Sequence, residues 1–253
     1  MRLRLRLVAI LSLLFGSTLA RVDSKSGGEI APTFNSDLLM RAMGVPLCVR
    51  KCIDPFLDQI SEIWHMNQIV EKIPGLCRSH PQALECLRKQ PSCDTHNLFK
   101  KASSSVQKVC GERAALFEKM RPCLSKNGDA VARTCDARCS SRATLTAFMN
   151  NPAIQRAAKM GGNIMAVNDN LGPLCSVLNC ELACITTELN KVCPLSGWLT
   201  LDILLQPFES VADLLLESSP SLKDFLAKKM DKRCRFVLQK SELMKLRKGQ
   251  FNL

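Results

Sequence analysis

The fourteen cysteines of this sequence are the residues whose type and spacing most directly predict chemistry. Two pairs have the spacing Cys-x3-Cys: Cys48 with Cys52, and Cys135 with Cys139. Residues four apart lie on one side of a helix, one turn from each other, so the two sulfurs of a pair point the same way. That geometry is poor for a bond within the pair, because a disulfide needs Cβ atoms that face each other. We therefore expect the two cysteines of each pair to bond to different partners on neighbouring segments.

The first twenty residues indicate that the chain is exported. Three arginines lie among the first six residues, an apolar run follows at 7–15, and small residues precede Ala20. This order is typical of a secretory signal peptide, and we expect cleavage after Ala20. The apolar run is too short to span a bilayer. The sequence therefore predicts that residues 1–20 are a signal peptide and that the mature protein is secreted and extracellular.

The cysteine count fits an oxidising compartment. An even, high number of cysteines in a secreted chain predicts a disulfide framework. We expect all of them to be oxidised: Cys48, Cys52, Cys77, Cys86, Cys93, Cys110, Cys123, Cys135, Cys139, Cys175, Cys180, Cys184, Cys193 and Cys234. Lys126–Asp129 has the residue types of a turn, and seven cysteines lie on either side of it. Because seven is odd, at least one disulfide must join the two halves.

No set of residues has the spacing of a catalytic or metal site. His80 with Cys77 or Cys86 could bind zinc, but in a secreted chain we expect those sulfurs to be oxidised. The other two histidines, His65 and His96, lack ligand spacing with His80. The motifs Gly-x-Ser-x-Gly, His-Glu-x-x-His and Cys-Cys-x-x-His-Asp are absent. We therefore predict no catalytic residue, no metal and no cofactor, and a protein that is not an enzyme.

Basic residues gather at the C-terminal end. Ten basic and three acidic residues lie between Lys223 and Lys248, in a chain whose formal net charge is +12. Five of the basic residues crowd one stretch: Lys228, Lys229, Lys232, Arg233 and Arg235. Such a stretch is either a solvated face that aids solubility or a docking strip. In a secreted protein with no tyrosine and two tryptophans, the expected partners are acidic glycans or an anionic membrane surface, and not nucleic acid.

A serine in the N-terminal segment has the context of a glycosaminoglycan attachment site. Residues 21–35 are rich in Ser, Gly and Lys, and we expect a flexible tail there. Within it, Ser26-Gly27 lies between Asp23 and Glu29, and a Ser-Gly with acidic neighbours is the type of site that receives xylose. An ordinary linker is the alternative for so short a motif. A second Ser-Gly, at Ser196, lies in a segment that looks structured, and no Asn-x-Ser/Thr sequon occurs.

The elements that must position these residues are predicted to be helices. Apolar residues recur at spacings of three and four, and no segment has the alternation of a strand. The strongest amphipathic stretch runs from Leu201 to Leu215, and a last, basic helix is expected from about Leu222 to Lys248. The predicted fold class is therefore all-α.

The two halves of the chain resemble each other weakly. Cys-x3-Cys and Cys-x8-Cys occur in each half with the same spacing, whereas the loops between them differ in length. Matching spacings indicate duplicated modules, although many cysteines can also match by chance. We predict two disulfide-stapled helical modules, residues 36–125 and residues 126–253, the second including the basic C-terminal helix. Cys123 and Cys180 have no counterpart in this alignment and are the candidates for the bond between halves.

The segment Leu47 to Phe56, with the pattern Leu-Cys-x3-Cys-Ile-Asp-Pro-Phe, resembles secreted cysteine-rich domains of nematodes. With the other cysteine spacings and the signal peptide, it is similar to the chondroitin proteoglycan 4 domain family, over about residues 45–123 and again over about 130–195. The resemblance implies a helical, disulfide-bonded extracellular module, in some members on chains that carry chondroitin. It implies no catalytic residue. The single favourable Ser-Gly departs from a heavily substituted core protein.

Together, these features predict a secreted, non-enzymatic protein of the extracellular matrix or of a surface, with a chondroitin proteoglycan core protein as the specific form. The alternative is a helical carrier of lipid or of another small ligand, saposin-like in its physics. Its support is the amphipathic stretch from Leu201 to Leu215 and the ten methionines, which suit adaptable apolar surfaces. Both features are also consistent with ordinary core packing.

Overall fold

The computed structural model describes residues 35–61, 66–94, 97–218 and 228–251, and in these residues it contains helices and no strand. The predicted all-α fold is confirmed. The described helices are α2 (Ser36–Ala42), α3 (Leu47–Ser61), α4 (Met66–Arg88), α5 (Leu98–Ala102), α6 (Ser104–Cys110), α7 (Ala114–Cys139), α8 (Ser141–Met149), α9 (Pro152–Lys159), α10 (Ile164–Asp169), α11 (Gly172–Val192), α12 (Ser196–Ser218), the 3-10 helix η3 (Lys232–Leu238) and α14 (Lys240–Arg247).

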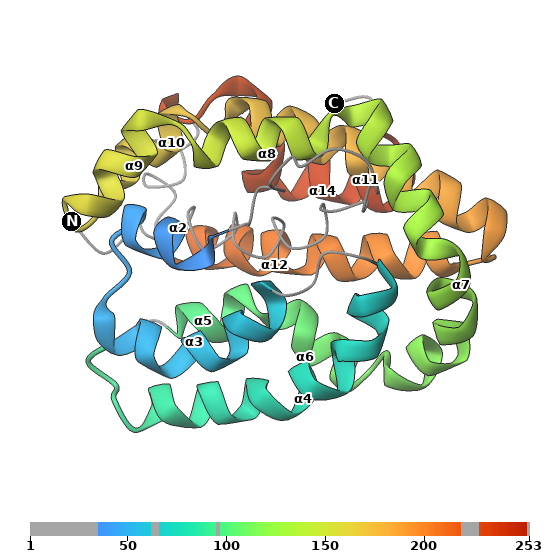
Figure 1. The fold of residues 1–253 in the computed structure, drawn as a ribbon, viewed down its shortest axis with the longest axis horizontal. Helices are drawn as coiled ribbons and strands as arrows, with labels where there is room; N and C mark the ends of the chain where they lie inside the picture. Colours follow the sequence, from blue (N-terminus) through green and yellow to red (C-terminus); the bar gives the residue numbers. More distant parts are fainter. Residues whose placement is uncertain (1–34, 62–65, 95–96, 219–227, 252–253) are drawn as a thin grey trace, which may run out of the picture.

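Helix α12 runs through the middle of the molecule (Figure 1). Helices α3 to α6 lie on one side of it, α8 to α11 lie on the other, and α7 runs along one end between the two groups. The predicted amphipathic face of α12 explains its place, because Leu201, Leu205, Phe208 and Ala212 follow one another at three- and four-residue spacing and are all buried. This face therefore packs in the core. The amphipathic stretch that supported a ligand carrier is thus explained by core packing.

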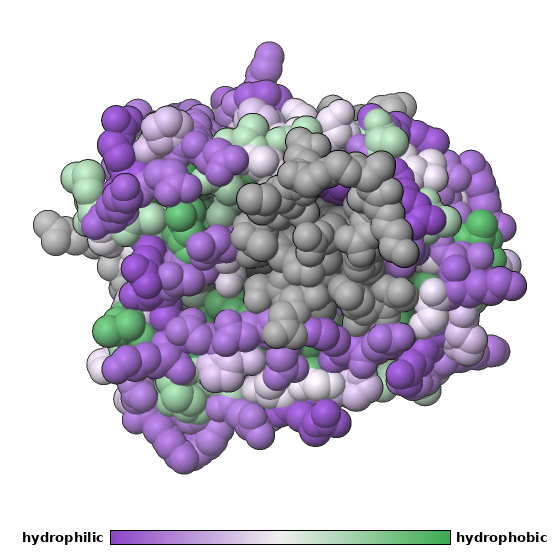
Figure 2. Space-filling view, in the orientation of Figure 1, coloured by the Kyte–Doolittle hydropathy of each residue, from purple (hydrophilic) through white to green (hydrophobic). Residues whose placement is uncertain are grey.

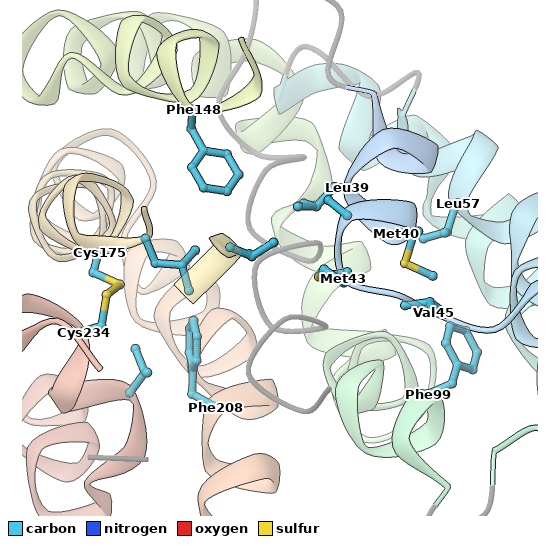
Figure 3. Close-up of a cluster of buried hydrophobic side chains, with 14 of the residues drawn as sticks. Leu39, Met40, Met43, Val45, Leu57, Phe99, Phe148, Cys175, Phe208 and Cys234 are labelled. Carbon is cyan, nitrogen blue, oxygen red and sulfur yellow. A yellow bond between two sulfur atoms is a disulfide. The ribbon is translucent and has the colours of Figure 1, made fainter. Parts of the chain in front are cut away.

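The main core joins residues from Leu39 near the start to Leu246 near the end of the described chain. Figure 3 shows Phe208 of α12 in this cluster, with Phe148 of α8 and the α2 side chains Leu39 and Met40. Next to it, the Cys175–Cys234 disulfide joins α11 to η3. Both predicted halves thus contribute to one hydrophobic core.

Seven disulfides pair all fourteen cysteines, and none is free. The first Cys-x3-Cys pair lies on α3 and the second on α7, and each cysteine of a pair bonds to a different partner, as the spacing predicted. The bonds are Cys48–Cys93, Cys52–Cys86, Cys77–Cys110, Cys123–Cys193, Cys135–Cys184, Cys139–Cys180 and Cys175–Cys234.

The predicted link between halves through Cys180 is wrong. Cys180 bonds to Cys139, and the bond between the halves is Cys123–Cys193. The reason is the antiparallel packing of α7 on α11: Cys135 meets Cys184, so a cysteine earlier on α7 must meet one later along the chain. The internal repeat is supported only weakly by the bonds. Cys77–Cys110 and Cys175–Cys234 correspond in the sequence alignment, whereas the other bonds of the two halves do not.

The predicted turn at Lys126–Asp129 is also wrong, because these residues lie inside α7. Gly128 is buried there, and the side-chain amide of Asn127 donates to the carbonyl of Cys123, 3.1 Å away. The buried residues Leu124, Val131 and Cys135 lie on one side of the helix at spacings of seven and four, so packing overrides the local preference for a turn. The boundary predicted between the two modules falls within this helix, and the division into modules stays a prediction.

The last predicted helix, from about Leu222 to Lys248, is not continuous; residues 219–227 lie outside the described part of the chain. A helical turn ends at Lys229, Asp231 is extended and caps η3, and Gln239 is extended before α14. The reason is burial. Phe236, Val237 and Leu238 are consecutive and all buried, which one side of an α-helix cannot achieve.

Candidate functional site

The five basic residues singled out in the sequence lie on the surface of one short segment. Lys228 and Lys229 end a helical turn, and Lys232, Arg233 and Arg235 belong to η3; all five are exposed. We call these residues the C-terminal basic surface. They do not lie on one continuous helix as predicted, because the backbone leaves the helical conformation at Met230 and Asp231.

Buried neighbours hold the C-terminal basic surface in place. Met230, Cys234 and Phe236 are buried between the basic residues, so the chain alternates between anchoring and exposed side chains. The Cys175–Cys234 disulfide ties η3 to α11, and the side-chain amide of Asn168 donates to the carbonyl of Lys229, 3.1 Å away. The positive charges are therefore carried by a segment whose backbone is fixed on α10 and α11.

One of the five cations has a carboxylate partner. Arg233 binds Asp231 in a bidentate ion pair, with Nη2 2.7 Å from Oδ2 and Nε 2.9 Å from Oδ1. The hydrogen bonds from Arg233 hold the pKa of Asp231 well below its usual range. Within the described part of the chain, no ion pair is seen for the other four cations of this surface. These four carry its net positive charge.

Of the four basic residues further along the chain, Lys240, Lys245 and Arg247 are paired with carboxylates, and Lys248 has no ion pair in the described structure. Lys240 Nζ lies 2.9 Å from Asp213, and Lys245 Nζ lies 2.8 Å from Glu242. Arg247 is largely buried. Much of the positive charge that the sequence concentrates in this region is therefore already matched by carboxylates.

Arg247 belongs to a charge network that joins three helices. It forms ion pairs with Asp202 and Glu209 of α12, and Lys108 Nζ of α6 lies 3.0 Å from Asp202. Burial raises the pKa of Glu209 and lowers the pKa of both Lys108 and Arg247. Because both carboxylates are held by cations, the arrangement fixes α6 and α14 on α12.

A histidine and a serine lie in contact inside the core. His80 Nε2 is 2.7 Å from Ser103 Oγ, and that hydroxyl donates to the Phe99 carbonyl, also at 2.7 Å. Phe56 and Phe99 pack against the His80 ring, and burial lowers the pKa of His80. Ser103 has no exposed surface, so a substrate cannot reach it. We interpret the pair as a satisfied polar contact of the core.

The sulfurs considered for zinc near His80 are in disulfides. Cys77 bonds to Cys110, and Cys86 bonds to Cys52. Over the described ranges of the chain, no group of three or more His, Cys, Asp or Glu is placed to hold a metal ion.

A buried glutamate is the polar group that the sequence analysis missed. Glu181 of α11 is only 3% exposed. The Ser141 hydroxyl donates to its Oε1, while its Oε2 has no hydrogen-bond partner in the described structure. Burial raises the pKa of Glu181 to about 7, and the nearby Asp136 also acts to raise it. One sequence signal could have found it. Glu181 lies three residues after Leu178 and four residues before Ile185, so it falls on the same side of the helix as these apolar residues.

The two Ser-Gly sequences differ in access. Ser196 has no exposed surface, and its hydroxyl donates to the carbonyl of Cys193, 2.6 Å away. A side chain at Gly197 would collide with the carbonyl of Thr186, so this segment is closely packed on α11. Ser196 is therefore closed to a glycosyltransferase. Ser26, like the predicted signal peptide, lies outside the described residues.

Comparison with known proteins adds a family. A search of curated proteins and a search of solved structures find no match to this chain. Among the described helices, none has the length and apolar character needed to cross a membrane. A model of one family, described as chondroitin proteoglycan 4, matches residues 37–253 and thus includes both halves and the C-terminal basic surface. This protein belongs to the chondroitin proteoglycan 4 family.

Proposed function

We propose that this protein is a secreted, non-enzymatic core protein of a chondroitin proteoglycan, located in the extracellular matrix or on a surface, with its chain attached at Ser26. The family match supports a relation to chondroitin proteoglycans. The observation that carries the attachment site is the burial of Ser196, because the sequence contains only two Ser-Gly dipeptides. Ser26 is the one that remains.

The sequence around Ser26 supports this assignment. Asp23 and Glu29 flank the Ser-Gly, and eight residues lie between Ser26 and Asn35, whose side chain caps α2. The proposed attachment site thus precedes the first described helix. A polyanionic chain attached there would leave the disulfide-bonded helical region as a separate, folded anchor for contacts with the matrix.

Expression in animal cells tests the attachment site. We expect the wild-type protein to have a broad mass distribution that chondroitinase collapses to a single species. The variant Ser26→Ala should give that single species without the enzyme. Ser24→Ala is the matched control, because it removes a neighbouring serine that no glycine follows, and it should behave as wild type.

Two results would contradict the proposal. A wild-type protein whose mass is unaffected by chondroitinase would show that Ser26 is part of an ordinary linker. A Ser26→Ala protein that still carries chondroitin would place the chain on another residue.

The C-terminal basic surface supports a second part of the proposal, which is contact with acidic glycans of the matrix. Four of its cations have no ion pair in the described structure, and all five are exposed on a fixed backbone. Sulfated glycans present closely spaced negative charges, so such a surface attracts them at low and moderate salt.

A further inference from the structure

Three large apolar side chains are exposed at the turn between α11 and α12. Val192 is 46% exposed, Leu195 is 65% exposed and Trp198 is 43% exposed. The turn lies at one end of the long axis of the molecule, and Figure 2 shows hydrophobic surface at that end. We call these three residues the α11–α12 tip.

The backbone of the α11–α12 tip is held firmly, so its exposure does not come from a loose loop. Cys193 bonds to Cys123 of α7, with 5.9 Å between their Cα atoms. The backbone N–H of Gly197 donates to the side-chain oxygen of Asn190, 3.0 Å away, and the buried Ser196 bonds to Cys193. The apolar side chains therefore project from a rigid frame.

Leu195 is exposed at an energetic cost. Its φ is +70°, in the left-handed region, which glycine adopts more readily than leucine. A glycine at this position would relieve the backbone and remove the exposed apolar surface. The fold gains nothing visible from the leucine side chain, so an interaction outside the fold is the more economical explanation for it.

Exposed lysines lie on two segments that contact the turn between α11 and α12. On α7, the exposed residues Lys119 and Lys126 lie one turn before and one turn after Cys123. Cys123 is bonded to Cys193, which is next to Val192 of the tip. Lys248 follows α14 and precedes Gly249, where an added Cβ would lie 2.8 Å from the Trp198 ring. No ion pair is seen for these three lysines in the parts of the chain that are described.

Acidic residues near the tip are already matched. Glu118 lies 3.3 Å from Arg121, and Glu188 lies 3.0 Å from Lys191. The charge that remains around the exposed apolar residues is therefore positive.

We propose that the α11–α12 tip inserts into an anionic lipid membrane. Leucine and valine side chains gain by leaving water for the acyl region, and tryptophan favours the boundary between headgroups and acyl chains. The three lysines lie where they can meet lipid phosphates. A glycan would use the lysines but would not need the exposed leucine, so the apolar residues favour lipid. The proposal uses neither Ser26 nor the C-terminal basic surface, so it does not rest on the proposed function.

Tryptophan fluorescence can test the insertion directly, because the sequence has only Trp64 and Trp198. The probe protein is the mature chain with Trp64→Phe and Ser26→Ala, which leaves Trp198 as reporter and removes any chain at Ser26. It is mixed with vesicles of phosphatidylcholine alone, and with vesicles that contain phosphatidylserine. We expect a blue shift of Trp198 emission with the anionic vesicles, and quenching by brominated acyl chains.

Variants separate insertion from general attraction. Leu195→Gly should weaken binding to anionic vesicles at least tenfold while keeping the fold, and Val192→Ser should act in the same direction. Lys119→Gln with Lys126→Gln should weaken binding and reduce its dependence on salt. Met160→Ser is the matched control, since Met160 is 81% exposed on the turn after α9 and should have no effect.

Three results would overturn the proposal. The first is the absence of a blue shift or of quenching with anionic vesicles. The second is binding to vesicles that Leu195→Gly leaves unchanged. The third is a Trp198 response to soluble chondroitin sulfate and none to vesicles, which would make the tip a glycan contact.

Discussion

At the scale of single residues, the carboxyl group of Glu181 is a buried acid whose pKa is strongly raised. It lies inside the protein on α11, between Cys180 and Cys184, which bond to α7. One of its oxygens has no hydrogen-bond partner in the described structure, and burial raises its pKa to about 7. A buried, unpaired carboxylate is costly, so the neutral acid is the form that this site favours.

The raised pKa makes stability depend on pH in a defined direction. The pKa of Glu181 is 4.5 in the unfolded chain, the ordinary value for a glutamate, and about 7 in the folded protein, so folding is favoured when the group is protonated. Its contribution to stability is fully present below pH 4.5 and is lost as the pH rises to about 7. The full difference corresponds to about 3 kcal/mol as an upper value.

We therefore expect Glu181→Gln to increase the free energy of unfolding at pH 7.5 and to flatten its change between pH 4.5 and 7. Denaturant unfolding at several pH values measures both effects. His80 acts in the opposite direction, because burial lowers its pKa and its contribution is lost as the pH falls below 6.5. The difference between wild type and variant removes the His80 effect. Glu118→Gln, on the exposed side of α7, is the control, and parallel curves for wild type and Glu181→Gln would contradict the prediction.

Residue spacing in the sequence predicted part of the disulfide framework. The i,i+4 geometry of Cys48 and Cys52 excludes a bond between them, and the structure gives them separate partners. Spacing does not reveal which partners, because these depend on how α3 packs on α4 and on how α7 packs on α11. The predicted bond of Cys180 is wrong for this reason, although Cys123 does join the two halves.

At the scale of elements, local sequence preference failed where tertiary packing is strong. The segment Lys126–Asp129 has the composition of a turn, yet it continues α7 because buried apolar residues on both sides of it belong to one core cluster. The segment around Cys234 has the composition of a helix, yet a disulfide and three consecutive buried residues make it η3. By contrast, the sequence predicts α12 well, since the burial pattern from Leu201 to Ala212 has helical spacing.

The element-scale consequence concerns the C-terminal basic surface. Because η3 is fixed by Cys234, its cations are held close together, and we expect retention on immobilised chondroitin sulfate above physiological salt. Salt releases a protein held by exposed charges, because such charges are screened within about 8 Å at physiological ionic strength. Changing Lys228, Lys232 and Arg235 to Gln removes three of the attracting charges and should therefore lower the salt concentration needed for elution. Ser26→Ala protein is used, so that no attached chain competes with the column.

A matched control distinguishes this surface from general charge. Lys51, Lys100 and Lys159 are exposed lysines on α3, α5 and α9. Their triple change to Gln removes the same charge from other surfaces and should move elution much less. Equal shifts for the two triple variants, or elution of the wild type below physiological salt, would reduce the basic surface to a solubility feature.

At the scale of the whole molecule, the predicted modules are connected in three ways. Helix α7 crosses the predicted boundary without a break, the main core contains residues of both halves, and Cys123–Cys193 bonds one half to the other. The sequence indicated the bond through the odd number of cysteines in each half. It could not indicate the shared core, because the buried faces of α2 and α12, which both contribute to it, carry no sign of their partners.

These connections determine how the protein should unfold. Because one core spans both halves, we expect a single cooperative thermal transition for the oxidised protein, and not one transition per predicted module. Calorimetry tests this expectation, because the calorimetric and van't Hoff enthalpies should then be equal. The double variant Cys123→Ser with Cys193→Ser should still unfold in one transition, because the continuous α7 and the shared core still connect the two halves.

The midpoint of that transition should fall by about 10 °C, since a disulfide contributes about 3 kcal/mol and each kcal/mol moves the midpoint of a chain of this size by about 2–4 °C. The variant Cys77→Ser with Cys110→Ser, which removes a bond within the first half, is the comparison and should lower the midpoint by a similar amount. If removal of Cys123–Cys193 instead divides unfolding into two transitions, the halves are independent modules held together by that bond. Two transitions in the oxidised wild type would lead to the same conclusion, because the shared core would then add too little to couple the halves.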